Sequence, residues 1–421
     1  MMNGATDSAA ITRCRVCENS ALDKVLDLGS MALTGVFPSS DAAAVPSHPL
    51  ELVRCIPDGD RTCGLVQLRH TAELRDMYSD GYGYRSGLNS AMVAHLRAVV
   101  AGILRRVDIG PDDLVLDIGS NDATLLRSYP PGSGTRVGID PVGEKFRRYY
   151  PPDVLLLPDF FSRELITAAL GNRRAKVITS IAMFYDLPRP LDFMADIRAC
   201  LADDGIWVLE QSYLPAMLAS TSYDTVCHEH LEYYALHQLD WMAQRSGLVV
   251  LEVARNEING GSFALTLAPA GTPYRRDSES VQRLRAEEAR LGLDEPDAYA
   301  DFARRARRHR AAIREFFERS RAAGRRTVGY GASTKGNVLL QYCGLDTGDL
   351  PCIAEVNEEK FGKFTPSTGI PIVSEDEARR YRPDQFFVLP WHFRDTLIER
   401  EREFRAAGGR LVFPLPQLSV V

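Results

Sequence analysis

Residues 114–126 read LVLDIGSNDATLL, in which an apolar strand passes through a glycine turn toward a helix. The glycine at position 119 lets the backbone approach a ligand closely, and a helix that follows begins with free N–H donors. Beyond this stretch, strand-like and helix-like patterns alternate, which predicts an α/β domain with a mostly parallel sheet and a terminal hairpin. The predicted strands are 114–118, 136–139, 154–157, 176–181, 205–211, 248–253 and 262–268, and a helix is predicted over 90–106 ahead of them.

Acidic residues end the next two predicted strands. Asp140 lies 21 residues after the turn glycine, where a carboxylate can accept both ribose hydroxyls of a nucleoside. Asp159 and Phe160 end the third strand, where a carboxylate can take an adenine amino group and a ring can stack on the base. Because the turn lacks the full G-x-G-x-x-G of dinucleotide binders, a nucleoside without phosphates is favoured. The combination predicts an S-adenosylmethionine site that includes Asp117, Gly119, Asn121, Asp140, Asp159 and Phe160.

A second α/β pattern occupies 324–421, after an Arg- and Glu-rich stretch at 276–323 that predicts one or two surface helices. It opens with GYGASTKGN at 329–337, a glycine turn that can receive phosphates through backbone N–H groups and one ammonium. A packing role without a ligand is the alternative for this turn. The candidate substrate contacts are Tyr330, Lys335 and Asn337; strands are predicted over 327–330, 352–356, 385–389 and 410–413, and helices over 335–342 and 396–407.

Two cysteine pairs fall in the first 72 residues, which otherwise show short apolar runs between turns. Cys14 and Cys17 form a C-x2-C knuckle, and Cys55 and Cys63 form a wider C-x7-C pair. Four thiolates in two close pairs are typical of a tetrahedral Zn²⁺ site, which can stabilise a segment with a small core. The alternative is four buried thiols without a metal. The spacing favours structural zinc.

Composition excludes several classes of function. The chain has 421 residues, 45% hydrophobic and 25% charged, with a formal net charge of -6. No general basic field is present for nucleic acid or anionic lipid. No apolar run reaches the roughly 20 residues that span a bilayer, and the first residues lack the apolar core of a signal peptide. These features predict a soluble cytoplasmic protein with no nucleic-acid or membrane partner.

The segment YDTVCHEHLEYY at 223–234 follows the fifth strand, so it is expected to overhang the methyl donor. The pair His228 and His230 lacks the i, i+4 spacing of a zinc helix, whereas a His base beside the carboxylate of Glu229 fits proton removal from carbon next to a ketone. A structural His pair is the alternative. The turn NGGS at 259–262 has an ordinary hairpin role as its simplest interpretation.

Taken together, these blocks resemble the sugar C-methyltransferase family, which acts on nucleotide-linked keto-deoxysugars. The resemblance covers essentially the whole chain and includes the Y-x-Y-x-S motif of Tyr82, Tyr84 and Ser86. It implies an N-terminal zinc-binding domain (1–72), a central class I Rossmann-like methyltransferase domain (73–275), a helical connector (276–323) and a C-terminal Rossmann-like domain (324–421).

The resemblance further implies methylation of a ring carbon, commonly C3 beside a 4-keto group of a dTDP-linked sugar. His230 is then expected to be the base that forms an enolate, and the remaining catalytic candidates are Glu229, His228, Tyr82 and Tyr84. Ser86 is expected on the donor side, and Cys227 and Asn259 on the substrate side. The expected protein is a monomer or weak homo-oligomer.

Two departures from the family pattern lie on the expected substrate side. Cys227 stands where some relatives have Tyr, and residues 182–188 replace an N-x-x-x-H-I-P-like run. The sugar or the methylated carbon is therefore open. An O- or N-methyltransferase acting on another small metabolite is one alternative, and a non-catalytic zinc-ribbon binding protein is a second.

Overall fold

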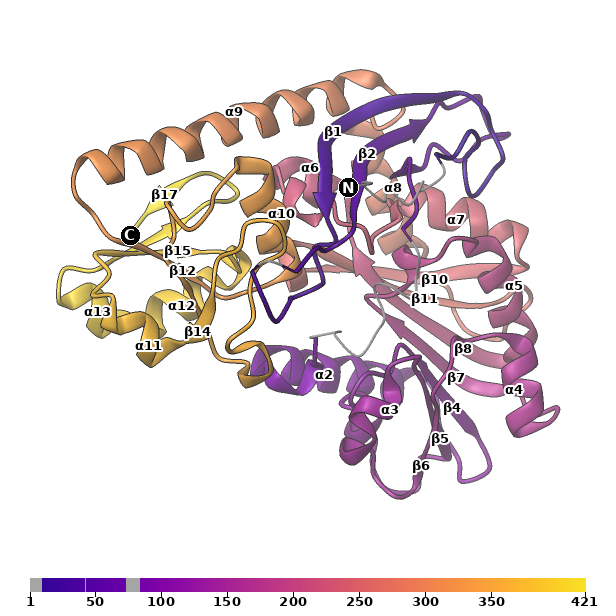
Figure 1. The fold of residues 1–421 in the computed structure, drawn as a ribbon. Coiled ribbons are helices and arrows are strands. Elements are labelled where there is room, and N and C mark those ends of the chain that lie inside the picture. Colours follow the sequence, from indigo (N-terminus) through magenta and orange to yellow (C-terminus); the bar gives the residue numbers. More distant parts are fainter. Residues whose placement is uncertain (1–9, 42, 73–83) are drawn as a thin grey trace.

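The central sheet of the computed structural model has seven strands in the order β10-β11-β8-β7-β4-β5-β6 (Figure 1). The model describes residues 10–41, 43–72 and 84–421. The five strands from β8 to β6 are parallel, and the antiparallel hairpin of β10 and β11 completes one edge. The predicted parallel sheet with a terminal hairpin is confirmed. The strands are β4 (Leu114–Ile118), β5 (Thr135–Ile139), β6 (Val154–Leu157), β7 (Ala175–Ile181), β8 (Leu201–Ser212), β10 (Leu248–Asn256) and β11 (Ser262–Pro269).

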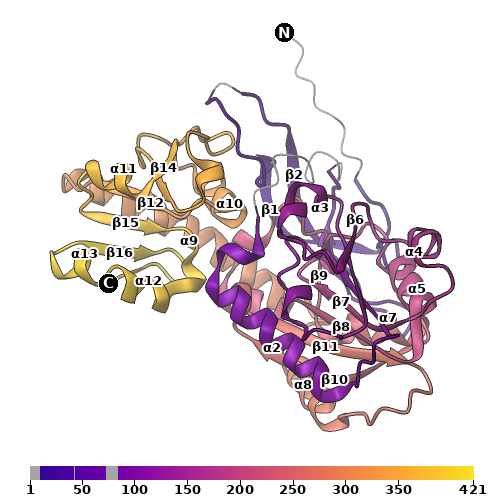
Figure 2. The same ribbon diagram turned by 90° about the horizontal axis from the view of Figure 1, so that it is seen from below.

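Helix α2 (Ser90–Arg106) covers one face of this sheet and has the predicted bounds (Figure 2). It begins at Asn89, whose side chain accepts hydrogen bonds from the first free N–H groups of the helix. Its buried face includes Leu96 and Val100, which pack against sheet residues such as Val115 and Val208. The other helices of the central domain are α3 (Gly143–Phe146), α4 (Arg163–Leu170), α5 (Pro190–Cys200), α6 (Leu214–Ser220) and α7 (Leu236–Arg245).

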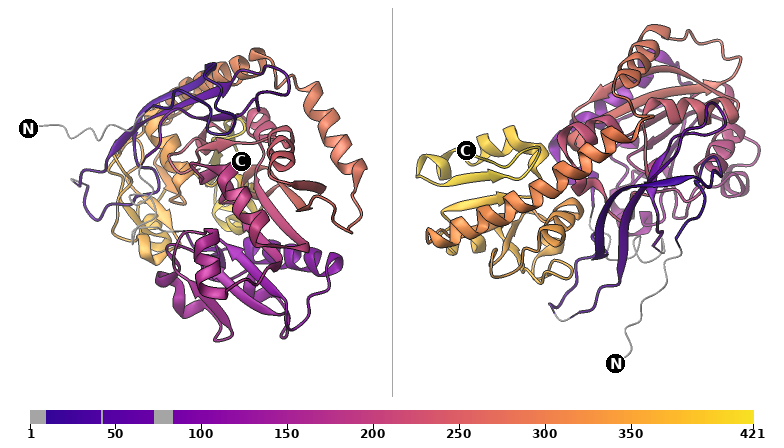
Figure 3. Two further views of the ribbon diagram at one scale, coloured as in Figure 1. Left: turned by 90° about the vertical axis from the view of Figure 1, so that its right-hand side faces the viewer. Right: turned by 90° about the horizontal axis from the view of Figure 1, so that it is seen from above.

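The N-terminal part differs from the expected short runs between turns. It contains two long antiparallel strands, β1 (Leu22–Ala32) and β2 (Ser47–Cys55), which lie beside the C-terminal domain (Figure 3). Strand β3 (Val66–Leu68) pairs with β9 (Glu232–Tyr233), so residues of the central segment complete the N-terminal sheet. The long strands escaped prediction because register shifts interrupt their alternation of apolar and polar residues.

The connector forms α8 (Ser278–Arg290) and the 27-residue α9 (Pro296–Ala322), as predicted. Helix α9 runs along the C-terminal sheet and reaches the N-terminal strands, where Arg54 lies 5.0 Å from the ring of Tyr299 (Figure 1). The C-terminal sheet has six strands in the order β14-β13-β12-β15-β16-β17. Its strands are β12 (Thr327–Tyr330), β13 (Ile353–Glu355), β14 (Ile372–Ser374), β15 (Gln385–Val388), β16 (Arg410–Phe413) and β17 (Ser419–Val420).

One predicted C-terminal helix is broken. The segment 396–407 forms α12 (Arg394–Arg400) and α13 (Arg402–Ala406), separated at Glu401. The buried Glu401 carboxylate accepts hydrogen bonds from the hydroxyl of Tyr330 and the guanidinium of Arg379, and this anchors the break to the domain core. The remaining helices are α10 (Thr334–Cys343) and α11 (Glu375–Arg380). Within the described ranges, no helix is both long and apolar enough to cross a bilayer.

Candidate active site

The four N-terminal cysteines converge on one point. Their sulfur atoms all lie within 4.8 Å of one another, and three of the separations are 3.4–3.5 Å. A tetrahedral Zn²⁺ with Zn–S bonds of about 2.3 Å separates its sulfurs by about 3.8 Å, so the cluster fits this ion. In the widened C-x7-C loop, the N–H of Asp58 donates to the Thr62 hydroxyl at 2.6 Å, which closes the loop. The predicted ligands therefore form one set.

The cysteine cluster also joins two domains. Cys14, Cys55 and Cys63 share one apolar core with residues of the central domain. Nearby, the Gln238 side chain of α7 donates to the carbonyl of Gly64 at 3.2 Å. A metal bound by these cysteines would hold the N-terminal sheet against α7. The cysteines are far along the chain from the glycine turn, which follows a strand of the central sheet.

At the predicted donor turn, Gly119 has a φ of +73° and Asn121 a φ of 49°. The two carboxylate oxygens of Asp140 accept the N–H groups of Asn121 and Val142, both at 2.8 Å. Asp117 accepts the hydroxyl of Thr179 at 2.6 Å, and burial raises its pKa to about 7. Hydrogen bonds thus join the residues that follow β4 to those that follow β5, and together these two ends form a cradle for the predicted donor.

The segment after the Y-x-Y motif lies on this turn. The N–H of Ser86 donates to the Asn121 side chain at 3.0 Å, and that side chain donates to the carbonyl of Tyr84 at 3.2 Å. Tyr82 lies outside the described residues. Asp159 and Phe160 are exposed at the end of β6, where the Asp159 carboxylate accepts the Phe160 N–H at 2.7 Å.

The His230 ring is neutral, and its hydrogen bond fixes which nitrogen carries the proton. A carbonyl can only accept, so the 2.8 Å contact of its Nδ1 with the carbonyl of Thr225 places a proton on Nδ1. Nε2 is then the acceptor of the neutral ring. Burial and the charge of Lys335 lower the pKa of His230 to about 3, and the ring of Tyr185 lies 4.3 Å from its own. Tyr185 belongs to the segment 182–188 that departs from the family pattern.

The three residues that precede His230 in the sequence have surroundings different from those of the His230 ring. His228 is buried, with Nε2 3.3 Å from the carbonyl of His48 in β2, and burial lowers its pKa to about 4. Burial raises the pKa of the Glu229 carboxyl and of the Cys227 thiol. A Cβ added to Gly35 of the N-terminal domain would lie 2.1 Å from Oε1 of Glu229, so backbone and carboxylate are in close contact.

The C-terminal domain contributes through α10. Lys335 Nζ donates to the carbonyl of Asn259 at 2.7 Å, and the Asn337 amide donates to the carbonyl of Thr34 at 2.7 Å. These two predicted substrate residues therefore lie where the three domains meet. Tyr330 instead points into the core of its own domain, where its hydroxyl donates to Glu401 at 3.0 Å.

Three family models match the chain in sequence order. A zinc binding domain matches residues 14–78, a methyltransferase domain residues 92–253, and a C-methyltransferase C-terminal domain residues 257–416. C-methyltransferase NovU of Streptomyces niveus is 31% identical over 414 residues, which are 98% of this chain and 97% of that protein. The chain belongs to the C-methyltransferase family.

Solved structures add only partial overlaps to this C-methyltransferase assignment. The CcbJ methyltransferase from Streptomyces caelestis is 15% identical and covers 42% of this chain and 90% of its own, with a TM-score of 0.33. The cyclopropane synthase MmaA2 from Mycobacterium tuberculosis is 16% identical and covers 42% of this chain and 84% of its own, also at 0.33. The resemblance to C-methyltransferases is confirmed by the full-length relative, together with S-adenosylmethionine as donor and the zinc-binding domain.

A partly buried polar cluster of this C-methyltransferase was not predicted from the sequence. His95 Nε2 lies 2.6 Å from Oε1 of Glu210, whose other oxygen accepts the Asn256 amide at 2.9 Å. The Asn256 side chain also accepts the N–H of Ile258 at 3.0 Å. The cluster thus connects α2 to the turn that carries Asn259. Its members are far apart in the chain, so no spacing motif could reveal them.

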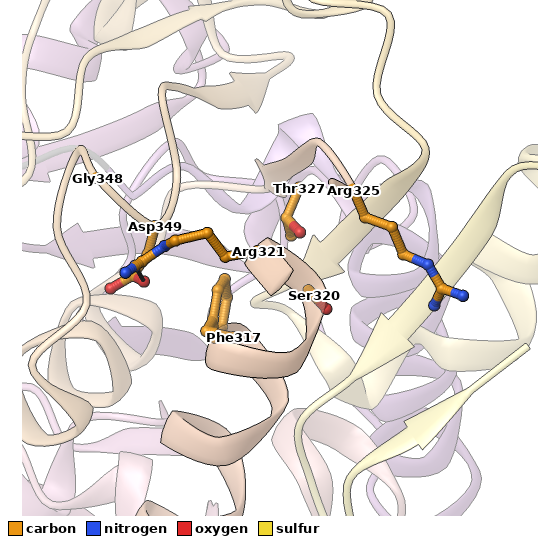
Figure 4. Close-up of a pocket in the computed structure, with 7 residues that line it drawn as sticks. All are labelled: Phe317, Ser320, Arg321, Arg325, Thr327, Gly348 and Asp349. Atoms are coloured by element: carbon orange, nitrogen blue, oxygen red, sulfur yellow. Dashed lines mark hydrogen bonds and ion pairs between the residues drawn. The ribbon is translucent and has the colours of Figure 1, made fainter. Parts of the chain in front are cut away.

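Two cavities lie away from His230. One of about 50 Å³ is at the end of α9, where Arg321 pairs with Asp349 at 2.5 Å (Figure 4). A larger one of about 360 Å³ lies between the donor domain and the C-terminal domain, and Arg85 and Tyr149 contribute to its wall. Of the predicted site residues that the structure describes, none lines either cavity.

We expect Asp140→Ala to weaken S-adenosylmethionine binding by about 2 kcal/mol, because it removes the predicted acceptor for the ribose and frees the two N–H groups that shape the turn. Isothermal titration calorimetry measures this directly. Glu144→Ala, which removes an exposed carboxylate that pairs with Arg147, is the matched control. Unchanged affinity in Asp140→Ala would show that the donor lies elsewhere.

Proposed function

We propose that this C-methyltransferase moves a methyl group from S-adenosylmethionine to a ring carbon of a nucleotide-linked deoxysugar, at C3 beside a 4-keto group. The observation that carries the proposal is the tautomer of His230, whose Nδ1–H is held by the Thr225 carbonyl at 2.8 Å. Nε2 is therefore available to accept a proton from carbon. O-Methylation alone would need no carbon base, so this arrangement favours the carbon acceptor.

In the proposed reaction, His230 takes the proton from the carbon next to the ketone, and the electron pair moves onto the ketone oxygen. The enolate carbon then takes the methyl group as its bond to sulfur breaks. Tyr82 or Tyr84 donates a hydrogen bond to the developing oxyanion. S-Adenosylmethionine supplies the electrophilic methyl, and the zinc ion takes no part in the step.

Glu229 is assigned the role of binding the sugar. The residue is half-buried, its carboxylate oxygen Oε2 is buried, and the carboxylate lies against Gly35 of the N-terminal domain and next to the proposed base along the chain. A carboxylate there can accept a sugar hydroxyl and fix the ring relative to His230. Cys227 and the segment 182–188 border the same region, so they are the candidates for substrate discrimination.

We expect Gly35→Ala to lower turnover about 10-fold or more, because the new methyl would lie 2.1 Å from Oε1 of Glu229 and displace the carboxylate. Donor affinity and zinc content should stay unchanged. Steady-state kinetics, calorimetry and metal analysis measure the three quantities. Gly102→Ala in α2, where the nearest atom is the end of the Arg105 side chain at 3.7 Å, is the control. Full activity in Gly35→Ala would remove Glu229 from the proposal.

The function is tested with labelled S-adenosylmethionine and a panel of 4-keto sugar nucleotides, followed by NMR of the product. A new methyl on the ring carbon, with solvent deuterium at that carbon when the donor is omitted, is the expected result. A methyl on oxygen or nitrogen would replace the proposal with the corresponding methyltransferase. No transfer to any sugar nucleotide would direct the search to other metabolites.

A further inference from the structure

Lys335 brings a cation from the C-terminal domain to the region of His230. It lies in the first turn of α10, and its Nζ donates to the carbonyl of Asn259 at 2.7 Å. Within the described part of the chain, this is the one hydrogen-bond acceptor of the ammonium. An ammonium carries three N–H donors, so two of them are available to a ligand.

The surroundings of the ammonium hold it in place. Asn259 lies in a turn whose next residue, Gly260, packs against the Trp391 ring. A Cβ added to Gly260 would lie 3.3 Å from an atom of that ring. The Trp391 indole N–H donates to Asp224 at 2.7 Å, and Asp224 is fully buried in the segment that carries His230. Three segments that are distant in sequence are therefore linked to one another beside Lys335, which is itself half-buried.

The charges around Lys335 are coupled. Burial lowers the pKa of Lys335, and the charge of Asp224 opposes this, which helps to keep the ammonium protonated. Burial and the charge of Lys335 lower the pKa of His392 as well as that of His230. A base weakened in this way can remove a proton from carbon only if the negative charge that forms is stabilised strongly.

We propose that Lys335 is a catalytic residue that donates a hydrogen bond to the ketone oxygen of the substrate and stabilises the enolate. The inference rests on the proposed function. The positive charge that weakens His230 as a base makes the carbon next to the ketone more acidic, and in an enclosed site this effect is larger than in water. Tyr82 or Tyr84 of the Y-x-Y motif can donate to the same oxygen, since an oxyanion accepts more than one hydrogen bond.

The step balances without another reactant. The C–H proton goes to Nε2 of His230, the C–H electron pair forms the C=C bond, and the carbonyl pair moves to oxygen. Lys335 keeps its proton throughout. When the carbon takes the methyl group, the ketone is restored, the sulfonium becomes a neutral thioether, and His230 releases its proton to solvent.

The alternative to a catalytic role is a purely structural one, in which Lys335 only holds the Asn259 turn. The test must separate these two roles. The readout is solvent deuterium exchange at the carbon next to the ketone, measured without methyl donor. We expect Lys335→Met to lower the exchange rate by about 10²-fold or more, and Lys335→Arg, which retains a cation, to lose less. Lys24→Met, at an exposed lysine of β1, is the matched control.

Chemical rescue completes the test. We expect methylammonium chloride to restore part of the exchange in Lys335→Ala, whereas sodium chloride at equal ionic strength does not. Exchange in Lys335→Met within about threefold of the unchanged protein would overturn the proposal. A loss of exchange that the amine fails to restore would also overturn it, in favour of the structural role. If the unchanged protein exchanges no proton in any 4-keto sugar nucleotide, the proposed function itself fails.

Discussion

His230→Asn is expected to lower the turnover of methyl transfer by roughly 10²-fold or more, the scale for loss of a general base. The amide keeps a polar group of similar reach but cannot take a proton from carbon. Donor affinity should change little, because His230 is no part of the cradle formed by β4 and β5. Stopped assays with labelled donor give the turnover, and calorimetry gives the affinity.

The same variant should lose solvent deuterium exchange at the reacting carbon. His228→Asn is the matched control, because that ring is buried against β2, with Nε2 3.3 Å from the His48 carbonyl. Exchange that persists in His230→Asn but disappears in His228→Asn would transfer the role of base to His228.

The lowered pKa of His230 gives this prediction a pH dependence. A base whose pKa has dropped from 6.5 to about 3 stays neutral as the solution is acidified through pH 6.5. We therefore expect kcat/KM to show no histidine-type decrease in that range. A loss of activity centred near pH 6.5 would mean that a solvent-exposed histidine, and not His230, removes the proton.

Cys17→Ser is expected to release the zinc and destabilise the chain more than an ordinary core substitution does. Apparent binding free energies of structural zinc are roughly 10–16 kcal/mol in small peptides at pH 7, and part of this is folding free energy. The Cys14, Cys55 and Cys63 sulfurs belong to a core shared by the N-terminal and central domains, so loss of the ion should loosen their contact. Metal analysis and thermal unfolding measure the two effects.

Cys352→Ser is the control for this experiment, since it exchanges the same atoms at a buried thiol outside the cluster. We expect it to keep its zinc and to unfold at a temperature closer to that of the unchanged protein. A Cys17→Ser protein that retains one zinc per chain and full stability would contradict the assignment of Cys17 as a ligand.

Features with a local cause could be predicted from the sequence. The strand β4, the glycine turn and the helix α2 follow from apolar periodicity and from residues within a few positions of one another. The C-x2-C spacing likewise indicated the zinc ligands, because both members of a pair lie on one short loop. The break of the 396–407 helix at Glu401 was not predictable, since its partners Tyr330 and Arg379 come from other elements.

The sequence by itself determined the α/β architecture, the order of the three domains, and the family, because each depends on local patterns and their order along the chain. Only the tertiary structure decided which ring nitrogen of His228 and of His230 faces a backbone carbonyl, and that Glu229 contacts Gly35 of another domain. It alone brought Lys335 to Asn259 and His95 to Glu210. Such pairs form when separate elements bury their apolar faces against each other, and that packing leaves no signal in the spacing of the residues it joins.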